Sequence, residues 1–282
     1  ENKNYRNMID KINNFNADIV HIMYDDRIDL LPFIKTYDNR PRIIYTSHWG
    51  YLPQIAKKRH DPYTSNIFNK AILARDKVEY FVLSDEIKDI YIKSGVPEYR
   101  IKVVHNGADE SMRFVENVKY PDRVIYLAKI DYRKRQYLFQ SIKNIYFAGN
   151  IADGRFNKDS SRYLGEWTRQ EVYRHLTDYC SLALLSDGDA DPLTTKEGLM
   201  AGCGLILSEY ATANLDLSKK WITVIPEDKI KDIEYVEKAI KENIELCKQP
   251  HIRKEIRKYA EEKFSWSNII WNNYLKEGLG VL

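Results

Sequence analysis

Short apolar runs rich in Ile, Val and aromatic residues alternate with longer amphipathic segments, and this alternation constrains the fold more than any other feature. In the first part of the chain the runs cover residues 17–23, 41–47, 79–84 and 100–106. Between them lie segments with helical spacing of apolar residues, at 28–37, 65–76 and 85–95. Buried strands separated by helices favour a parallel sheet with helical crossovers. The sequence therefore predicts an α/β fold.

The same alternation then starts again. The later apolar runs cover residues 123–130, 144–150, 161–166, 181–186, 203–209 and 221–226. Helical patterns follow at 168–179, at 195–202 and along the tail from residue 232. The more polar segment 112–123 predicts a connection between two halves. We therefore expect two Rossmann-like doubly wound domains facing a cleft, with functional residues just after the strands.

Charge, cysteine usage and missing motifs exclude several classes of protein. The net charge of the 282 residues is only +3, so nucleic acid is not a favoured partner. Cys180, Cys203 and Cys247 lie far apart, which predicts neither a zinc site nor a disulfide framework and favours a reducing, cytoplasmic setting. No apolar run approaches the roughly 20 residues that span a bilayer. No GxSxG, P-loop or GxGxxG occurs, which argues against common hydrolases, NTPases and dehydrogenases.

The most informative stretch is DGDADPLTTKE, residues 187–197, which follows the run 181–186 and opens a helical segment. A helix N-terminus there would offer free N–H groups to an anion. Glu197, in the first turn, could accept hydrogen bonds from vicinal hydroxyls such as those of ribose. Alternatively, Thr194 and Glu197 form a capping box. The aspartates of this stretch could chelate a divalent cation, although solvated turn acids are commoner.

Three further positions follow predicted strands. Lys129 and Lys134 could clamp a diphosphate and stabilise a leaving group, although a solvated basic turn is the alternative. His48 could contact a sugar hydroxyl or a reacting centre. His21 lies within a predicted strand, which favours a core or rim position. The turn Asn106-Gly107 is typical of positive φ and is expected to be structural.

In order along the chain, six segments resemble the retaining glycosyltransferases of family 4 (glycosyl transferases group 1), which have the GT-B fold. Their sequences are NADIVHIM, RIIYTSHWG, FVLSDEIKDIYIKSGVPEYRIKVVHNGAD, VIYLAKIDYRK, YLGEWTRQEVYRHLTDYCSLALLS and EKFSWSNIIWNNY. The resemblance covers nearly the whole chain. It implies an acceptor-side domain over residues 1–115, a nucleotide-sugar domain over 116–265, and a C-terminal helix over 266–282 that packs back toward the first domain.

Residue by residue, the resemblance implies roles in binding the donor. Asp189 and Glu197 match the two acids of the family's E-x7-E motif, which contact the donor sugar and the nucleotide ribose. Lys129 and Lys134 match the Arg/Lys pair on the diphosphate, and His48 matches the histidine near the donor sugar and acceptor.

The remaining contacts implied by the resemblance are to phosphate and base. Leu193 and Thr194 would offer amides to phosphate, while Tyr163 and Leu164 would flank the base. Three departures matter: an Asp replaces the first Glu of the motif, Lys129 replaces an Arg, and Pro192 occupies the usual glycine-rich slot and has no N–H to donate.

The expected activity is a hexosyltransferase-type transfer from a UDP- or GDP-linked sugar to a glycan, lipid-linked or protein acceptor, with retention at the anomeric carbon. The resemblance implies no metal and no other cofactor. The cysteine usage leads us to expect a cytoplasmic protein, with peripheral contact at a membrane surface as an alternative location. The front of the chain holds one helix where the family normally has another strand and loop, so the first domain is expected to be shortened or to lack upstream residues. A non-catalytic sugar- or partner-binding protein and a nucleotide-sugar epimerase of the same fold are the alternative functions.

Overall fold

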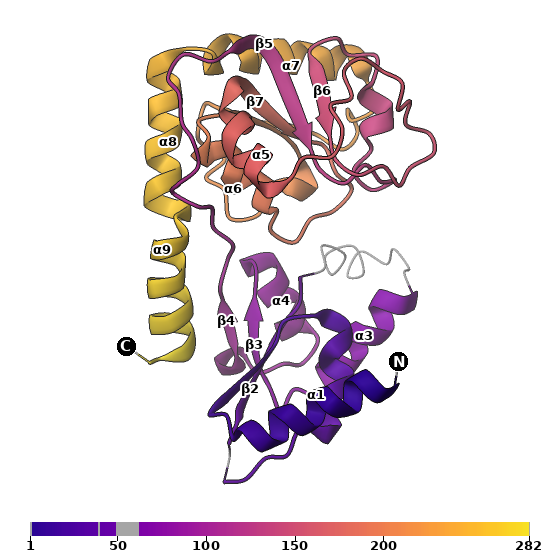
Figure 1. Ribbon diagram of the computed structural model, residues 1–282, viewed down its shortest axis with the longest axis vertical. Helices are drawn as coiled ribbons and strands as arrows, with labels where there is room; N and C mark the ends of the chain where they lie inside the picture. The colour runs from indigo at the N-terminus through magenta and orange to yellow at the C-terminus, as the bar shows by residue number, and fades with distance from the viewer. Residues whose placement is uncertain (1, 39, 49–61, 282) are drawn as a thin grey trace. The chain divides into compact units, whose positions relative to one another are not determined.

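A computed structural model describes residues 2–38, 40–48 and 62–281, with side chains from residue 5 onward. The chain divides into two compact units (Figure 1). Unit 1 comprises Glu1–His105 and Asn273–Leu282, and unit 2 comprises Asn106–Asn272. Each unit has a parallel sheet of its own, which confirms the predicted α/β class. No helix within the described ranges is both long enough and apolar enough to cross a membrane.

Unit 1 is built on a four-stranded sheet in the order β1-β2-β3-β4, with every neighbouring pair parallel. Its strands are Ile19–Ile22 (β1), Arg42–Thr46 (β2), Glu79–Val82 (β3) and Ile101–Val103 (β4). Its helices are Asn2–Phe15 (α1), Pro62–Leu73 (α3) and Asp85–Lys93 (α4), with the 3-10 helices Asp25–Phe33 (η1) and Glu98–Arg100 (η2). Parallel neighbours taken in chain order have right-handed crossovers, so η1, α3 and α4 are expected on one face of the sheet.

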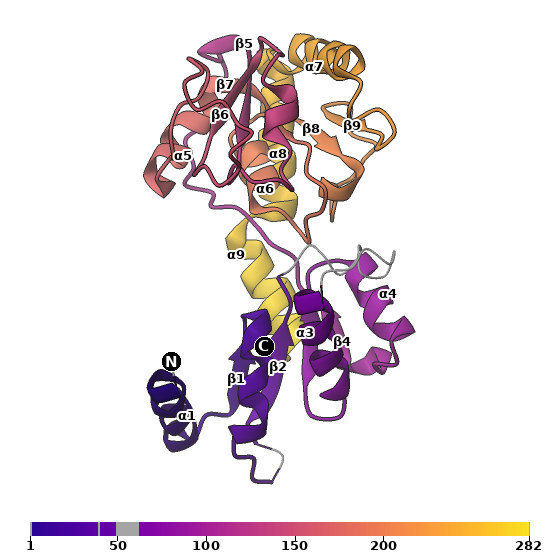
Figure 2. The ribbon, with the colours of Figure 1, turned by 90° about the vertical axis from the view of Figure 1, so that its right-hand side faces the viewer.

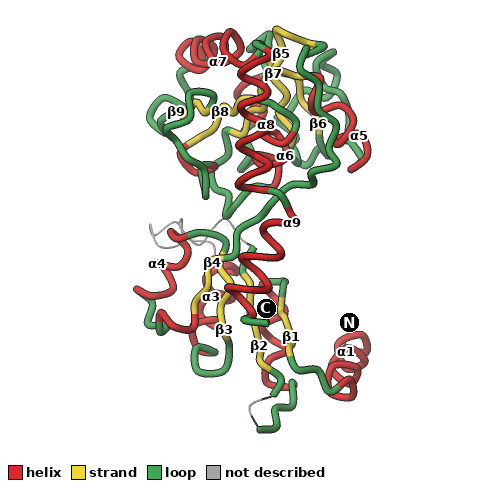
Figure 3. Tube along the Cα trace, turned by 90° about the vertical axis from the view of Figure 1, so that its left-hand side faces the viewer, coloured by secondary structure: helices red, strands yellow, loops and turns green. Residues whose placement is uncertain are grey.

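The C-terminal segment of the chain belongs to the packing of unit 1. The π-helical segment Ile269–Leu279 (η6) carries Tyr274, whose ring stacks on His21 at 5.7 Å and meets Phe81 edge-on at 5.6 Å. Figure 3 shows this segment running alongside the strands of the unit. His21 also bonds Thr46 Oγ1 at 2.8 Å and Tyr274 Oη at 2.7 Å, which confirms the expected core or rim position.

Unit 2 has a five-stranded parallel sheet in the order β6-β5-β7-β8-β9 (Figure 2). Its strands are Tyr120–Leu127 (β5), Ile145–Ala148 (β6), Tyr179–Leu184 (β7), Gly204–Ser208 (β8) and Ile222–Ile225 (β9). Its helices are Arg169–His175 (α5), Leu193–Met200 (α6), Ile233–Cys247 (α7), Pro250–Phe264 (α8) and Trp266–Asn268 (α9), with the 3-10 turns Gln136–Phe139 (η3), Leu176–Asp178 (η4) and Glu209–Ala211 (η5). The strand order reverses between β5 and β7, so this unit is doubly wound and has a topological switch point there.

Two predicted elements differ from the structure. Residues 161–166 form a single bridge, Phe147 to Tyr163. A turn at Ser160 precedes the bridge, and at Gly165, which has a positive φ, the next hydrogen bond, from Gly149 N–H to the Gly165 carbonyl, is out of register with a parallel ladder. The predicted helix at 28–37 is the 3-10 helix η1, which starts earlier and ends at Phe33. Pro32 lies inside it and has no N–H for a helical hydrogen bond, so the chain becomes extended at Ile34.

Candidate functional site

The loop after β7 brings together two residues predicted from the sequence, Lys134 and Asp189. The Lys134 ammonium lies 2.6 Å from Oδ1 and 2.8 Å from Oδ2 of Asp189, and both side chains are largely shielded from solvent. The Ser186 hydroxyl donates a further hydrogen bond to Asp189 Oδ2. Lys134 follows β5 and Asp189 follows β7, so this pair lies at the carboxyl edge of the sheet, at the switch point where open α/β sheets bind ligands.

The three aspartates of the loop point to three different cations. Asp187 pairs with Arg135 at 2.7 Å, Asp189 pairs with Lys134, and Asp191 pairs with Lys196 in an ion pair that is fully buried. A chelated divalent cation needs oxygens that converge on one point. In the part of the chain that the structure describes, no group of three or more His, Cys, Asp or Glu side chains is placed to hold a metal ion. In this arrangement the three carboxylates therefore do not converge on one point.

Asp191 also ties the start of unit 2 to the loop. The Asn106 backbone N–H donates to Asp191 Oδ2 at 2.6 Å, and the Asn106 amide donates to the Asp191 carbonyl at 2.7 Å. The turn Asn106-Gly107 is thus structural, as expected, but its predicted positive φ is wrong. Glycine is required at 107 by close packing, because a Cβ there would lie 2.7 Å from the Phe264 carbonyl oxygen.

Helix α6 begins at Leu193, with the extended residue Pro192 as its N-cap and no side-chain cap. Leu193 and Thr194 are the first two residues of the helix, and N–H groups in a first turn have no acceptor within the helix. The predicted capping box of Thr194 and Glu197 is therefore wrong, because Thr194 already lies inside the helix. Glu197 is the fifth residue of the helix, two positions further along than the capping box would place it. The same sequence pattern does form a capping box at Thr168 and Glu171, at the start of α5.

Glu197 is half-buried, and loss of hydration raises its pKa, while the positive charge of Arg169 acts in the opposite direction. Arg169 lies on α5 and donates two hydrogen bonds to the Tyr173 hydroxyl, at 3.0 and 2.7 Å. Sequence reasoning missed Arg169 as a charge near Glu197 and Tyr173 as the partner of Arg169. Their spacing of four residues on a helix is typical of any exposed helix face, so it carried no signal for a site.

Beside the switch point, the residues that follow β5 and β6 approach each other very closely. Gly149 follows β6 with φ of 148°, and a Cβ there would lie 1.9 Å from the Ala128 carbonyl oxygen. The Tyr163 hydroxyl donates to the Gly149 carbonyl at 3.0 Å, and Leu164 N–H donates to Phe147. Tyr163 and Leu164 therefore lie next to the end of β6, and Lys129, whose side chain is exposed, follows the end of β5.

Arg135 connects the loop after β5 to the loops after β7 and β9. It has a left-handed backbone with φ of 58°, and its guanidinium pairs with Asp187 at 2.7 Å and with Glu227 at 3.0 Å. Burial raises the pKa of Glu227, and Arg135 opposes that rise. Sequence reasoning missed Glu227, although its place just after the apolar run 221–226 was a usable signal. This network holds the surroundings of Asp189 in place.

In unit 1, His48 follows β2 at the carboxyl edge of that sheet. Its backbone N–H donates to Asp25 Oδ2 at 3.1 Å, and the Tyr45 hydroxyl donates to Oδ1 at 3.3 Å. Asp25 is only 4% exposed, and this burial raises its pKa. Partial loss of hydration lowers the pKa of His48, against the raising effect of Asp25. Trp49 and Gly50 of the same predicted motif lie outside the described residues.

Comparison with known proteins gives a family-model match for the first part of the chain and structural neighbours for the whole chain. The family model described as Glycosyltransferase Family 4 matches residues 2–111. No curated protein sequence matches the chain significantly.

The chain is similar in structure to Anabaena Alr3699/HepE, solved in complex with UDP and glucose, with a TM-score of 0.72, 12% identity, and coverage of 99% of this chain and 81% of that one. Sucrose-phosphate synthase from Thermosynechococcus elongatus is similar with a TM-score of 0.73 and 10% identity, and the match covers 98% of this chain and 77% of that one. The lipopolysaccharide outer core galactosyltransferase WaaB is similar with a TM-score of 0.68 and 15% identity, and the match covers 99% of this chain and 80% of that one. Residues 2–111 therefore resemble glycosyltransferase family 4, and the chain as a whole has the GT-B fold.

Proposed function

We propose that this chain transfers a hexosyl group from a nucleoside diphosphate sugar to an acceptor hydroxyl, with retention of configuration at the anomeric carbon. The observation that carries the proposal is the Lys134–Asp189 pair at the switch point of unit 2, where a cation and a carboxylate are held together at the edge that binds ligands in such sheets. HepE has been solved with UDP and with UDP-glucose, so a uridine donor is the first to test.

In this proposal, unit 2 holds the donor through its nucleotide and diphosphate. Glu197 accepts hydrogen bonds from the ribose hydroxyls, and Tyr163 and Leu164 flank the base. The N–H groups of Leu193 and Thr194, at the positive end of α6, donate to phosphate oxygens. Lys129 and Lys134 supply the cations that the diphosphate requires. We expect no metal ion, because these cations take over its charge-neutralising role.

The proposed chemical step follows from these charges. The acceptor oxygen bonds the anomeric carbon on the face from which the diphosphate oxygen departs, and the hydroxyl proton passes to that departing oxygen. Negative charge grows on the diphosphate, where Lys129, Lys134 and the start of α6 stabilise it. In unit 2, Asp189 orients the donor ring. In unit 1, His48 contacts a sugar hydroxyl. Lys134 is already shielded and held by Asp189, so little reorganisation is needed when the donor binds.

A ligand-binding experiment tests the donor assignment. Thermal unfolding is measured with UDP, GDP, ADP and their glucose conjugates, because a ligand at 100 times its Kd adds about 2.7 kcal/mol of stability. We expect one nucleotide to stabilise the wild type and to bind Glu197→Gln roughly 10- to 100-fold more weakly, because hydrogen bonds to a charged acceptor are lost. Glu255→Gln, on the exposed face of α8, is the matched control.

Product analysis then tests the reaction itself. With the nucleotide identified, NMR of the glycosylated product should show the anomeric configuration of the donor. Inversion would exclude the proposed same-face attack. If no nucleotide stabilises the protein, the donor site proposed in unit 2 is wrong.

A further inference from the structure

A cavity of about 670 Å³ lies among α1, η1 and α3 of unit 1. Its described walls combine aromatic rings with carboxylates: Tyr5, Phe33, Tyr63, Asp10, Asp26 and Asp29. A volume of this size is in the range of small-ligand sites. Because η1 contacts both α1 and α3, one short helix fixes the relative positions of these walls. We call this cavity the aromatic groove.

Two aromatic side chains of the groove are more than half exposed. Phe33 is 60% exposed and Tyr63 is 58% exposed, whereas Leu30 beneath them is buried. Exposed aromatic rings gathered on a concave surface mark a binding site more strongly than single exposed residues do. Their flat faces suit a ligand that has a flat apolar face of its own.

Two carboxylates of the groove are held in ion pairs and yet remain partly exposed. Asp29 pairs with Lys70 at 2.7 Å and Asp26 pairs with Arg27 at 3.3 Å, yet the two carboxylate side chains are 58% and 41% exposed. Arg27 also donates to the Tyr5 hydroxyl, and its guanidinium lies 4.9 Å from the Tyr5 ring centre. A carboxylate can accept several hydrogen bonds, so each retains acceptor capacity for a ligand.

We infer that the aromatic groove binds a pyranose ring of a neutral glycan acceptor. A pyranose has an apolar C–H face that can lie on Phe33 or Tyr63 and a rim of hydroxyls that can donate to Asp26 and Asp29. Carboxylates predominate among the charged side chains of the groove, which disfavours an anionic sugar. This inference rests on the proposed function for its meaning as an acceptor site.

The position of the groove within unit 1 agrees with that role. Asp26 of the groove is adjacent to Asp25, whose carboxylate accepts the backbone N–H of His48. Both aspartates lie in the first turn of η1, just after the carboxyl end of β1. Ligands bind at this edge in open parallel sheets. The Asp26 end of the groove lies at this edge, so a glycan that bonds Asp26 is held by the same turn of η1 that positions His48.

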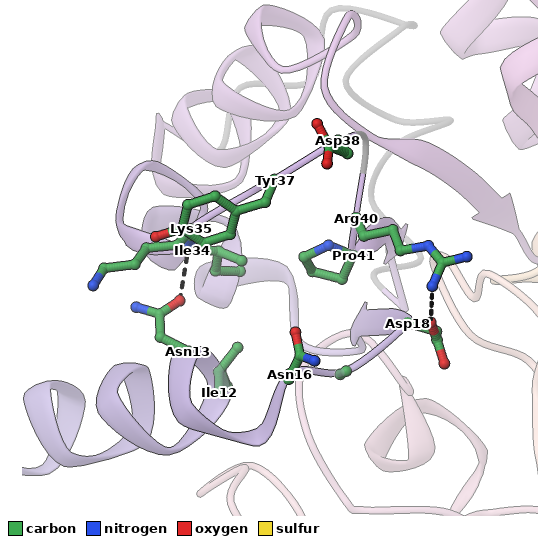
Figure 4. A pocket seen from close by; sticks show the side chains of 11 residues that line it. Ile12, Asn13, Asn16, Asp18, Ile34, Lys35, Tyr37, Asp38, Arg40 and Pro41 are labelled. Atoms are coloured by element: carbon green, nitrogen blue, oxygen red, sulfur yellow. Dashed lines mark hydrogen bonds and ion pairs between the residues drawn. The ribbon is translucent and has the colours of Figure 1, made fainter.

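A second cavity of unit 1 provides an internal comparison. It has a volume of about 500 Å³ and lies where β1 and β2 begin, at the opposite edge of the sheet (Figure 4). Among the described residues that line it, Tyr37 is the one aromatic side chain, and Asp18 pairs with Arg40. Tyr37 is 71% exposed, so its replacement is a matched control for replacement of Tyr63.

Binding of simple sugars to the full chain tests the inference. Maltose and cellobiose are the neutral probes, glucuronic acid is the anionic probe, and saturation-transfer NMR with titration gives the Kd values. We expect Phe33→Ala and Tyr63→Ala to weaken binding of a neutral probe roughly tenfold, the value of a ring contact. The controls Phe15→Ala, at a residue 81% exposed, and Tyr37→Ala should leave the Kd unchanged. Asp29→Asn should also weaken binding, without removing apolar surface.

The outcomes separate this inference from the donor assignment. If neither neutral sugar binds, if glucuronic acid binds more tightly, or if the groove variants bind like the wild type, the inference is wrong. Nucleotide titration of the same variants should give wild-type Kd values, because Phe33 and Tyr63 belong to unit 1. Sugar binding that depends on the groove, in a chain that binds no nucleotide, would support the groove and overturn the proposed function.

Discussion

Lys134 and Asp189 form a chelate-like ion pair in which one ammonium group lies 2.6 and 2.8 Å from the two oxygens of one carboxylate. The partners come from loops that follow different strands, so the pair joins the two sides of the switch point. A shielded lysine held in this way keeps its charge in one place. Lys134 is therefore suited to stabilise negative charge that develops on a departing diphosphate.

Lys134→Ala should lower kcat/KM for sugar transfer about 100- to 1000-fold, because it removes a preorganised cation from the leaving group. Arg133→Ala is the matched control, since it removes a cation from the same turn that pairs with Asp131. Steady-state kinetics with the identified donor measures both, after circular dichroism has verified that both are folded. Equal losses for the two variants would contradict a specific role for Lys134.

Lys196→Met should lower the free energy of unfolding by about 3–5 kcal/mol, because it leaves the fully buried Asp191 carboxylate without its cation. Lys241→Met removes a surface lysine that is 61% exposed and paired with Glu237, and it should cost no more than about 1 kcal/mol. Urea unfolding measures both. A loss below 1 kcal/mol for Lys196→Met would show that Asp191 is adequately compensated by Asn106 alone.

The sheet framework could be predicted from the sequence because buried parallel strands are continuous apolar runs, as in residues 181–186 and 203–209. The run 161–166 was wrongly predicted to be a strand, because its apolar residues lie against the edge of β6 and form only one bridge with it. The start of α6 was also not predicted correctly. Pro192 takes the N-cap position with no side-chain hydrogen bond, whereas sequence rules look for a Ser, Thr or Asp there.

The candidate site, like the fold, could be predicted from the sequence only in part. Lys134 and Asp189 could be named from the sequence, but their contact depends on how the loops after β5 and β7 fold. Asp187 pairs with Arg135, and Asp191 pairs with Lys196. These separate pairings depend on the tertiary packing of the loops. Local spacing is the same for a chelating cluster and for three separate ion pairs, so sequence alone left both open.

Gly149→Ala should destabilise unit 2 by at least about 2 kcal/mol and weaken donor binding, because a Cβ would overlap the Ala128 carbonyl oxygen at 1.9 Å. The backbone must then move where Lys129 leaves β5. Gly154→Ala is the control, since a Cβ there meets nothing within 4 Å and the backbone φ is not in the left-handed region. Urea unfolding and nucleotide titration measure the two effects. A stable Gly149→Ala variant with normal donor affinity would contradict the close packing.

The pH dependence of stability should reveal the neutral, half-buried state of His21. Burial, with a smaller contribution from His48, lowers the pKa of His21 in the folded chain to about 4. In the unfolded chain the pKa is about 6.5. Between these values the unfolded chain binds a proton that the folded chain does not bind. The free energy of unfolding therefore decreases as pH falls from about 6.5 toward 4, and this contribution is fully present above pH 6.5.

His21→Gln should remove that contribution, so the stability difference between wild type and variant should shrink as pH falls through the same window. His251→Gln, at an exposed position on α8, is the matched control and should show no such trend. Urea unfolding at a series of pH values gives the free energies, and NMR titration of the His21 ring protons gives the folded pKa directly. A His21 midpoint near 6.5 in the folded chain would contradict the predicted effect of burial against Thr46 and Tyr274.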